Sequence, residues 1–147
     1  MGNTNATVGI LGAGQLGRML GLAGLPLGVR CRFLDEPGRE AKPAASVGNV
    51  FEDGFKADAG SAATLDRFLD GLDAVTYEFE NVPADLAGAI AGRLPVRPSP
   101  RSLEIAQDRL RERELFEKLG IETPRWAAVS SLEELRAAID GGFPLPA

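Results

Sequence analysis

The feature that most constrains this chain is a glycine-rich turn near its start, within the segment Val8-Gly-Ile-Leu-Gly-Ala-Gly-Gln-Leu-Gly-Arg18. The apolar run Val8–Leu11 before the turn predicts a short buried strand. Gly12, Gly14 and Gly17 allow a tight turn, close approach of the backbone to a ligand and close packing of the next helix. Free N–H groups at the amino terminus of that helix favour an anion. The segment therefore predicts a phosphate-bearing ligand above the first strand, without saying which one.

Strands and helices are predicted to alternate through the first 100 residues. Helices are predicted at Gln15–Ala23, where Leu16, Met19 and Leu20 have helical spacing, at Ser61–Leu69 with Ser61 as its cap, and from Pro83 to about Gly92. Strands are predicted at Val8–Leu11, Val29–Leu34, Ser46–Phe51, Ala74–Phe79 and Leu94–Arg97. Such alternation is typical of an α/β fold, here a Rossmann-like parallel sheet with helices on both faces.

The composition changes after residue 100. One charged helix is predicted from Ser102 to Gly120, and its apolar positions lie along one side: Leu103, Ala106, Leu110, Leu115 and Leu119. A strand around Arg125–Val129 follows, and then a helix opened by Ser130 or Ser131.

The second part of the chain is predicted to be incomplete. One strand and two helices supply too little sheet to bury their own apolar faces. We therefore expect residues 1–100 to form one domain and residues 101–147 to open a second unit that the chain does not complete.

The composition excludes several classes of function. The 147 residues carry a formal net charge of -5 and no basic stripe, which argues against nucleic-acid binding. Neither a secretory signal nor a run of about 20 apolar residues is visible, so we expect a cytoplasmic protein without a membrane partner. The absence of histidine excludes His-based catalysis and most transition-metal sites. The single cysteine, Cys31, lies in a predicted strand and is interpreted as a buried small hydrophobe.

The glycine spacing is that of a dinucleotide-binding fingerprint. Asp35 follows the second predicted strand, where an acidic residue would hold a ribose hydroxyl. The same helix terminus would serve other phosphorylated ligands equally well. A third interpretation is purely structural, with glycines for a tight turn and Asp35 as a loop residue. These residues alone leave all three open.

Two carboxylates mark the end of the strand predicted at Ala74–Phe79. Glu78 and Glu80 are two residues apart, so on an extended strand both project to the same side. Adjacent carboxylates repel each other, which a protein tolerates better where a ligand offers amines or hydroxyls. The alternative is that both are solvated where the strand frays. Farther along, Arg109 belongs to a charged helix that could simply be a solvated face with i,i+4 pairs.

Taken together, several motifs resemble one known family, the N5-carboxyaminoimidazole ribonucleotide synthetases. These are the ATP-grasp ligases of purine biosynthesis, also called the ATPase subunit of phosphoribosylaminoimidazole carboxylase. The matching segments are Gly9–Leu20, Thr76–Pro83, Arg97–Pro100, Ile105–Leu110 and Leu119–Pro124. The resemblance runs from about Val8 to Phe143 and is more specific than a lone glycine fingerprint.

The resemblance implies a different use of the glycine turn. In this family the first, pre-ATP-grasp domain is Rossmann-like but binds no dinucleotide, and Asp35 becomes a loop residue. The positions implied to face the substrate 5-aminoimidazole ribonucleotide are Gly14, Gln15, Leu16, Glu78 and Glu80. Arg109 matches the position that reaches the ATP phosphates, a task that suits a permanently charged guanidinium.

The implied reaction uses MgATP to activate bicarbonate as carboxyphosphate, and the amine of the imidazole nucleotide captures the carboxyl group. Positioning and charge neutralisation matter more in this mechanism than acid–base side chains. No catalytic side chain and no metal ligand is assigned, because the family's ATP-contacting lysine and metal-binding carboxylates would follow Phe143. We therefore expect an amino-terminal portion that does not turn over by itself, in a family whose members are commonly homodimers. The rival hypothesis is an NAD(P)- or nucleotide-binding Rossmann domain of an oxidoreductase or regulatory protein.

Overall fold

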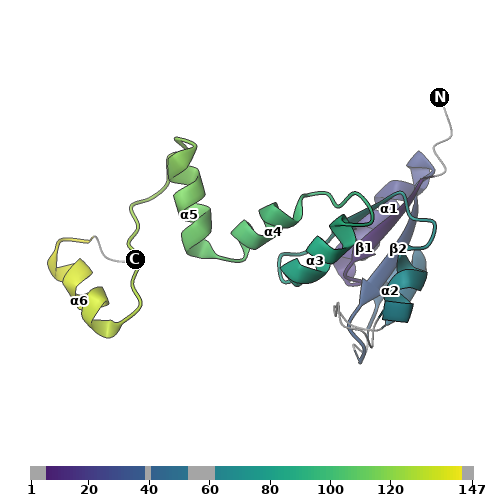
Figure 1. Ribbon diagram of the computed structural model, residues 1–147, viewed down its shortest axis with the longest axis horizontal. Coiled ribbons are helices and arrows are strands. Elements are labelled where there is room, and N and C mark those ends of the chain that lie inside the picture. Colours follow the sequence, from purple (N-terminus) through teal and green to yellow (C-terminus); the bar gives the residue numbers. More distant parts are fainter. Residues whose placement is uncertain (1–5, 39–40, 53–61, 144–147) are drawn as a thin grey trace. The chain divides into compact units, whose positions relative to one another are not determined.

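The structure is a computed structural model that describes residues 6–38, 41–52 and 62–143 (Figure 1). The chain divides into two compact units, residues 1–107 and 108–147. The strands of the first unit are β1 (Thr7–Leu11), β2 (Arg30–Asp35), β3 (Gly48–Glu52) and β4 (Ala74–Tyr77). Its helices are α1 (Gln15–Gly24), α2 (Ala62–Leu69), α3 (Ala84–Ala91) and α4 (Pro100–Ala106), with short 3-10 turns at Leu25–Leu27 and Pro43–Ser46. The second unit contains α5 (Arg109–Lys118) and α6 (Leu132–Asp140).

The four strands form one parallel sheet in the order β3-β2-β1-β4. In the register of the central strand, Val8 is aligned with Cys31 of β2 on one side and with Ala74 of β4 on the other. The strand predicted at Leu94–Arg97 is reduced to a single parallel bridge between Val75 and Val96. The predicted Rossmann-like parallel sheet is therefore confirmed, and its carboxyl edge is where β1 and β4 both end.

Two separate apolar clusters cover the two faces of the sheet. Ile10 and Phe33 pack with Ala13 and Ala44 on one face. On the other face, Leu11 packs with residues of β2 and β4 and with the apolar sides of α2 and α3. These residues are Leu34, Phe68, Leu69, Val75, Leu86, Ala87 and Ile90. Successive residues of a strand point to opposite faces, so this division follows directly from the strand sequences. Helices on both faces of the sheet are thus confirmed.

Helix α1 packs through glycines. Its buried residues are Gly17, Gly21 and Gly24, which share one face. A β-carbon at Gly21 would come within 2.6 Å of the Val47 side chain, so the helix lies too close to its neighbours for a larger residue. The leucine and methionine side chains that indicated a helix in the sequence lie on the opposite, exposed side.

Cys31 of β2 is a free, half-buried thiol. Burial raises its pKa, which favours the protonated thiol at neutral pH. A packing role therefore suits it, although the side chain is less buried than predicted.

The residues after 100 correct two sequence predictions. The single helix expected from Ser102 to Gly120 is two helices, because the chain breaks at Gln107 and Asp108 and the Asp108 carboxylate caps α5. Aspartate is a strong N-cap residue, because its side chain accepts hydrogen bonds from the first N–H groups of the new helix. No strand forms at Arg125–Val129, where the described backbone has no sheet partner. The helix opened by Ser131 is confirmed as α6.

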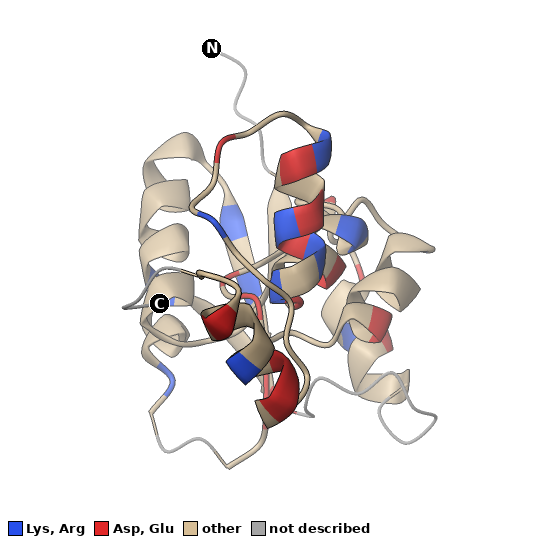
Figure 2. Cartoon of the chain, turned by 90° about the vertical axis from the view of Figure 1, so that its left-hand side faces the viewer, with Lys and Arg blue, Asp and Glu red and all other residues tan. Residues whose placement is uncertain are grey.

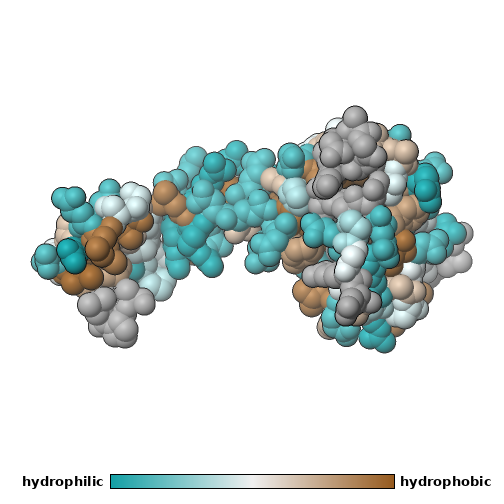
Figure 3. All heavy atoms as spheres, turned by 90° about the horizontal axis from the view of Figure 1, so that it is seen from below, coloured by the Kyte–Doolittle hydropathy of each residue, from teal (hydrophilic) through white to brown (hydrophobic). Residues whose placement is uncertain are grey.

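The two helices of the second unit have different surfaces. Basic and acidic residues alternate along α5 (Figure 2), and Leu110 and Leu119, two of the apolar positions expected along one side of the helix, are 41% and 61% exposed. Around α6, hydrophobic residues gather at the surface (Figure 3), where a groove of about 290 Å³ is lined by Trp126, Leu135, Ile139 and Phe143 among others. The Trp126 indole N–H donates to Glu117 Oε1 over 2.9 Å, which joins this segment to α5.

Candidate functional site

The glycine-rich loop forms the tight turn that the sequence predicts between β1 and α1. Gly12 has φ +109°, a conformation that favours glycine, and its N–H donates to the Leu34 carbonyl over 2.8 Å. Gly14 is the N-cap of α1 and supplies no side chain to satisfy the first N–H groups of the helix. Those donors require an acceptor from elsewhere.

The acceptor is Glu78. Its backbone N–H donates to the Leu11 carbonyl over 3.1 Å, which holds the start of the turn after β4 beside the end of β1. Its side chain then reaches the loop: Oε1 accepts from Gly14 N–H over 3.1 Å, and Oε2 accepts from Gly17 N–H. A residue 64 positions away in the sequence therefore caps α1. The site that the sequence assigned to an external anion holds the chain's own carboxylate.

A hollow of about 460 Å³ opens beside this carboxylate. Its walls are Leu16, Met19 and Leu20 from the exposed side of α1, together with Tyr77 and Glu78. Burial raises the pKa of the Tyr77 phenol, so this side chain is uncharged at neutral pH. The hollow combines an apolar lining with one carboxylate, an arrangement suited to an uncharged ring that bears an N–H or amine donor.

Glu80 occupies a different position from Glu78. Strand β4 ends at Tyr77, so the prediction that both glutamates extend along the strand toward one side is wrong. Glu80 lies in an exposed turn, and its carbonyl accepts from Gln107 Nε2 over 2.6 Å. The same amide donates to the Val82 carbonyl over 2.6 Å, so Gln107 fastens the turn that follows the site. Sequence reasoning missed this role, although Gln107 lay within one of the matching motifs.

The structure brings together some of the predicted site residues. Gly14, Leu16 and Glu78 meet at the loop, and Gln15 begins α1 as an exposed residue beside them. Arg109 belongs to the other compact unit, where its 79% exposed guanidinium pairs with Glu112. Met19 and Leu20 join the site without having been predicted there, because their spacing indicated a helix but not what its apolar side would contact.

Asp35 is a strand residue and not the loop residue that the family resemblance implied. It is the last residue of β2, aligned with Glu52 of β3, and only 1% of its surface is exposed. Its Oδ1 accepts from the Glu36 N–H over 2.9 Å. A side chain so buried presents almost no surface to a ligand in this structure, which weakens the dinucleotide-binding interpretation.

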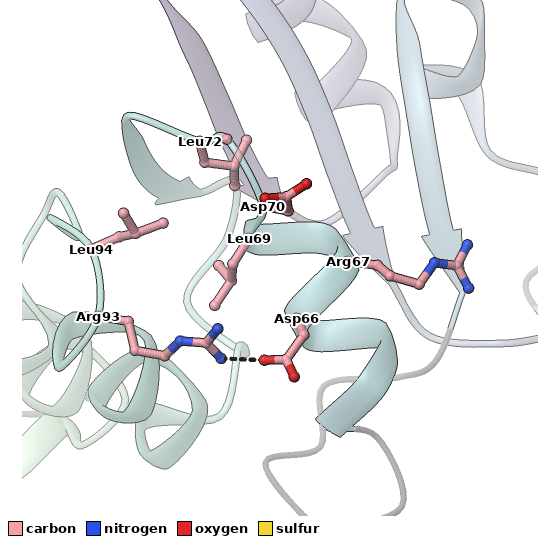
Figure 4. A pocket seen from close by; sticks show the side chains of 8 residues that line it. Asp66, Arg67, Leu69, Asp70, Leu72, Arg93 and Leu94 are labelled. Atoms are coloured by element: carbon pink, nitrogen blue, oxygen red, sulfur yellow. Dashed lines mark ion pairs between the residues drawn. The ribbon is translucent and has the colours of Figure 1, made fainter.

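A larger hollow of about 620 Å³ lies away from the loop, between the ends of α2 and α3 and the residues that lead into β4. Its side chains Asp66 and Arg93 form an ion pair of 2.8 Å, and Leu69, Leu72 and Leu94 also line the hollow (Figure 4). Both partners are largely exposed, so the pair is a surface contact of small energetic value. None of the predicted site residues lines this hollow.

Two features are absent from the part of the chain that the structure describes. No helix there is long and apolar enough to cross a membrane. Within the same residues, no group of three or more Cys, Asp or Glu side chains is arranged to hold a metal ion.

These features define a Rossmann-like α/β domain with a glycine-rich loop at the carboxyl edge of its sheet. Residues 5–107 match the family described as the ribonucleotide synthetase preATP-grasp domain, and the chain belongs to this family. An N5-carboxyaminoimidazole ribonucleotide synthase from Pseudomonas aeruginosa is 46% identical over 131 residues, which are 89% of this chain and 35% of the relative. The chain thus spans about a third of the length of the curated relatives it matches.

Solved structures agree with the sequence relatives. The crystal structure of N5-carboxyaminoimidazole ribonucleotide synthetase from Thermus thermophilus superposes with a TM-score of 0.80 at 47% identity, over 91% of this chain and 36% of the other. The Staphylococcus aureus synthetase in complex with ADP gives a TM-score of 0.78 at 26% identity, over 92% and 36%. The family resemblance that the motifs indicated is therefore confirmed.

Proposed function

We propose that this chain supplies the substrate-docking part of an ATP-dependent carbon–nitrogen ligase of purine biosynthesis. The reaction is carboxylation of 5-aminoimidazole ribonucleotide with bicarbonate to N5-carboxyaminoimidazole ribonucleotide. The observation that carries this proposal is the carboxylate of Glu78, held at the glycine-rich loop beside an apolar hollow. The names of the sequence and structural relatives support the substrate class.

The hydrogen-bonding capacity of Glu78 fits an amine ligand. An ionised carboxylate offers about four lone-pair positions. One is taken at each oxygen by a backbone N–H, from Gly14 at Oε1 and from Gly17 at Oε2. Each oxygen therefore retains capacity toward a ligand in the hollow. We assign Glu78 to the amino group of the substrate and Leu16, with Gly14 and Gln15, to the adjoining wall; Glu80 is assigned to the rim.

The remaining parts of the proposal concern the longer protein. ATP would phosphorylate bicarbonate, and the substrate amine would then attack the carboxyl carbon as phosphate leaves. Arg109, exposed in α5, is assigned to the ATP phosphates, and a Staphylococcus aureus relative was solved with ADP. Mg²⁺ would accompany ATP. We further assign residues 1–100 to the docking domain and 101–147 to the start of the ATP-grasp domain, in a cytoplasmic and dimeric enzyme.

Thermal unfolding with candidate ligands tests the docking role on the chain as it stands. A ligand that binds only the folded state raises the melting temperature by mass action. We expect a concentration-dependent shift with 5-aminoimidazole ribonucleotide that is lost in Glu78→Gln, a variant that keeps the side chain's size. Glu36→Gln is the matched control, because Glu36 is an exposed carboxylate that follows β2 at the same sheet edge. MgATP and NADH are run in parallel.

The outcomes separate the two classes of function. A shift with the imidazole nucleotide that survives in Glu36→Gln but not in Glu78→Gln supports the ligase. A shift with NADH instead would favour the oxidoreductase hypothesis, which the burial of Asp35 opposes. No shift with the imidazole nucleotide would contradict autonomous docking by this domain.

A further inference from the structure

The glycine spacing at 12, 14 and 17 is left unexplained by the proposed function, since it matches a phosphate-binding fingerprint in a domain assigned to an amine. We infer that the loop is a receptor for the chain's own Glu78 carboxylate, and that Glu78 thereby denies the loop to phosphate groups. Glu78 is then a specificity-determining residue against dinucleotides and other phosphates. This role holds whichever ligand enters the hollow beside Leu16.

The N–H donors of the loop are already occupied by Glu78. A phosphate at a glycine-rich loop is bound by the N–H groups at the amino terminus of the following helix. Here Gly14 N–H donates to Glu78 Oε1 over 3.1 Å and Gly17 N–H donates to Oε2. The Glu78 backbone is itself fixed to the Leu11 carbonyl, so the side chain starts from a held position. An incoming phosphate would need to displace this carboxylate or share its donors.

The glycines of the loop also leave space for the Glu78 side chain. A β-carbon at Gly12 would collide with the Glu78 side chain, and one at Gly17 would lie 2.7 Å from Glu78 Oε2. Two of the fingerprint's glycines therefore make room for a side chain of the protein. In a dinucleotide site the pyrophosphate approaches the backbone at the second glycine, and here the N–H of that glycine, Gly14, donates to Glu78.

The charge of a carboxylate at the loop also opposes phosphate binding. A carboxylate among the loop donors repels a phosphate brought to the same place. Glu78 is half-buried, so solvent screens this repulsion less than it would at an exposed position. A dinucleotide site would offer an acidic residue to the ribose. Here that residue, Asp35, is buried and presents almost no surface that could offset the repulsion of the phosphate. A phosphorylated ligand must therefore present some other group to the loop.

Removal of the carboxylate should convert the loop into an anion site. The experiment follows the amide NMR signals of Gly14 and Gly17 in the chain during titration with inorganic phosphate against chloride at constant ionic strength. We expect Glu78→Ala to show saturable shifts, with a dissociation constant at least about tenfold lower than that of the wild type. Glu36→Ala, which removes an exposed carboxylate at the same edge, should behave as the wild type.

Each result decides the inference. Saturable phosphate binding at Gly14 and Gly17 in the wild type, as tight as in Glu78→Ala, would overturn it. So would a folded Glu78→Ala chain whose loop amides do not respond. Glu78→Ser removes the carboxylate with a polar replacement and serves if the alanine variant does not fold. Failure of the proposed ligase function would leave these phosphate titrations unchanged, so the two hypotheses fail separately.

Discussion

The amino termini of three helices in this chain are capped in two different ways. Helix α5 is capped by Asp108 and helix α6 by Ser131, each the residue immediately before the helix. Helix α1 begins after a glycine without a side chain and takes its cap from Glu78, 64 residues from Gly14. A local cap stabilises one helix, whereas the distant cap also ties the end of β1 to the end of β4. Loss of the distant cap should therefore cost more and affect the whole first unit.

The largest effect is expected where a side chain would be forced between the loop and its cap. In Gly17→Ala the new β-carbon would lie 2.7 Å from Glu78 Oε2 and 2.8 Å from the Gly12 carbonyl oxygen. We expect the free energy of unfolding of the first unit to fall by about 3 kcal/mol, at the upper end for overpacking. Urea unfolding followed by circular dichroism measures it.

Gly88→Ala is the control for this substitution. Gly88 lies in α3, and a β-carbon there would meet nothing within 4 Å. This change should stabilise the protein by about 0.5–1 kcal/mol, because alanine favours a helix interior more than glycine does. The two changes in the free energy of unfolding need not be equal in size. A Gly17→Ala chain that is more stable than the wild type would contradict the close approach of Glu78.

The second effect is removal of the distant cap itself. Glu78→Ala leaves the N–H groups of Gly14 and Gly17 without their carboxylate acceptor. A hydrogen bond to a charged group contributes about 2 kcal/mol to the free energy of unfolding, and water can replace part of the lost bonding at this half-buried site. We therefore expect the first unit to lose about 2 kcal/mol in urea unfolding. Hydrogen exchange should accelerate at these two amides and also in β4. Acceleration confined to α1 would show that Glu78 acts only as a local cap.

The third effect is loss of a local cap. Asp108 Oδ1 accepts from the N–H groups of Leu110 and Arg111 over 3.0 and 3.2 Å, so Asp108→Ala should cost α5 about 1 kcal/mol. Trp126 fluorescence can follow the change, because its indole is hydrogen-bonded to Glu117 of α5. Glu114→Ala removes an exposed charge within the same helix and is the control. Destabilisation of the first unit by Asp108→Ala would erase the distinction between local and distant caps.

The same distinction explains how much could be predicted from the sequence. The alternation of elements, the parallel sheet and the Ser131 cap were accessible because each depends on residues close together in the chain. The two carboxylates after β4 also stand out in the sequence, but their arrangement could not be predicted from it. That Glu78 turns toward Gly14 while Glu80 lies in a turn depends on a contact across 64 residues.

Helix α1 shows a second physical limit. Its apolar spacing correctly indicated a helix, but the face that packs on the sheet is the one with Gly17, Gly21 and Gly24. Periodicity reports which residues share a side, and burial depends on how closely the neighbouring elements approach. The break at Asp108 escaped prediction for a related reason, because an aspartate inside a charged stretch resembles a solvated helix residue until its backbone is known to be extended.

The smallest effect is expected at the amino terminus of α6, where the cap is local and depends on pH. Glu134 Oε2 accepts from the Ser130 N–H over 2.7 Å and from its hydroxyl over 2.8 Å. The backbone bond from Ser130, aided by the hydroxyl, holds the pKa of this carboxyl below its ordinary value of 4.5. The stabilisation is therefore present above about pH 4.5 and is lost as the pH falls through the lower, folded-state pKa.

Amide NMR signals of Ser130 and of α6 between pH 7 and pH 3 check this expectation residue by residue. Glu134→Gln should reduce the order of α6 at neutral pH and match the wild type at the acid end, where the wild-type carboxyl is protonated. Glu133→Gln, the neighbouring acid in the same first turn, should leave the response of the Ser130 amide intact. Because Glu134 is fully exposed, solvent screening keeps the effect small, so a change that spread to the sheet of the first unit would contradict the local character of this cap.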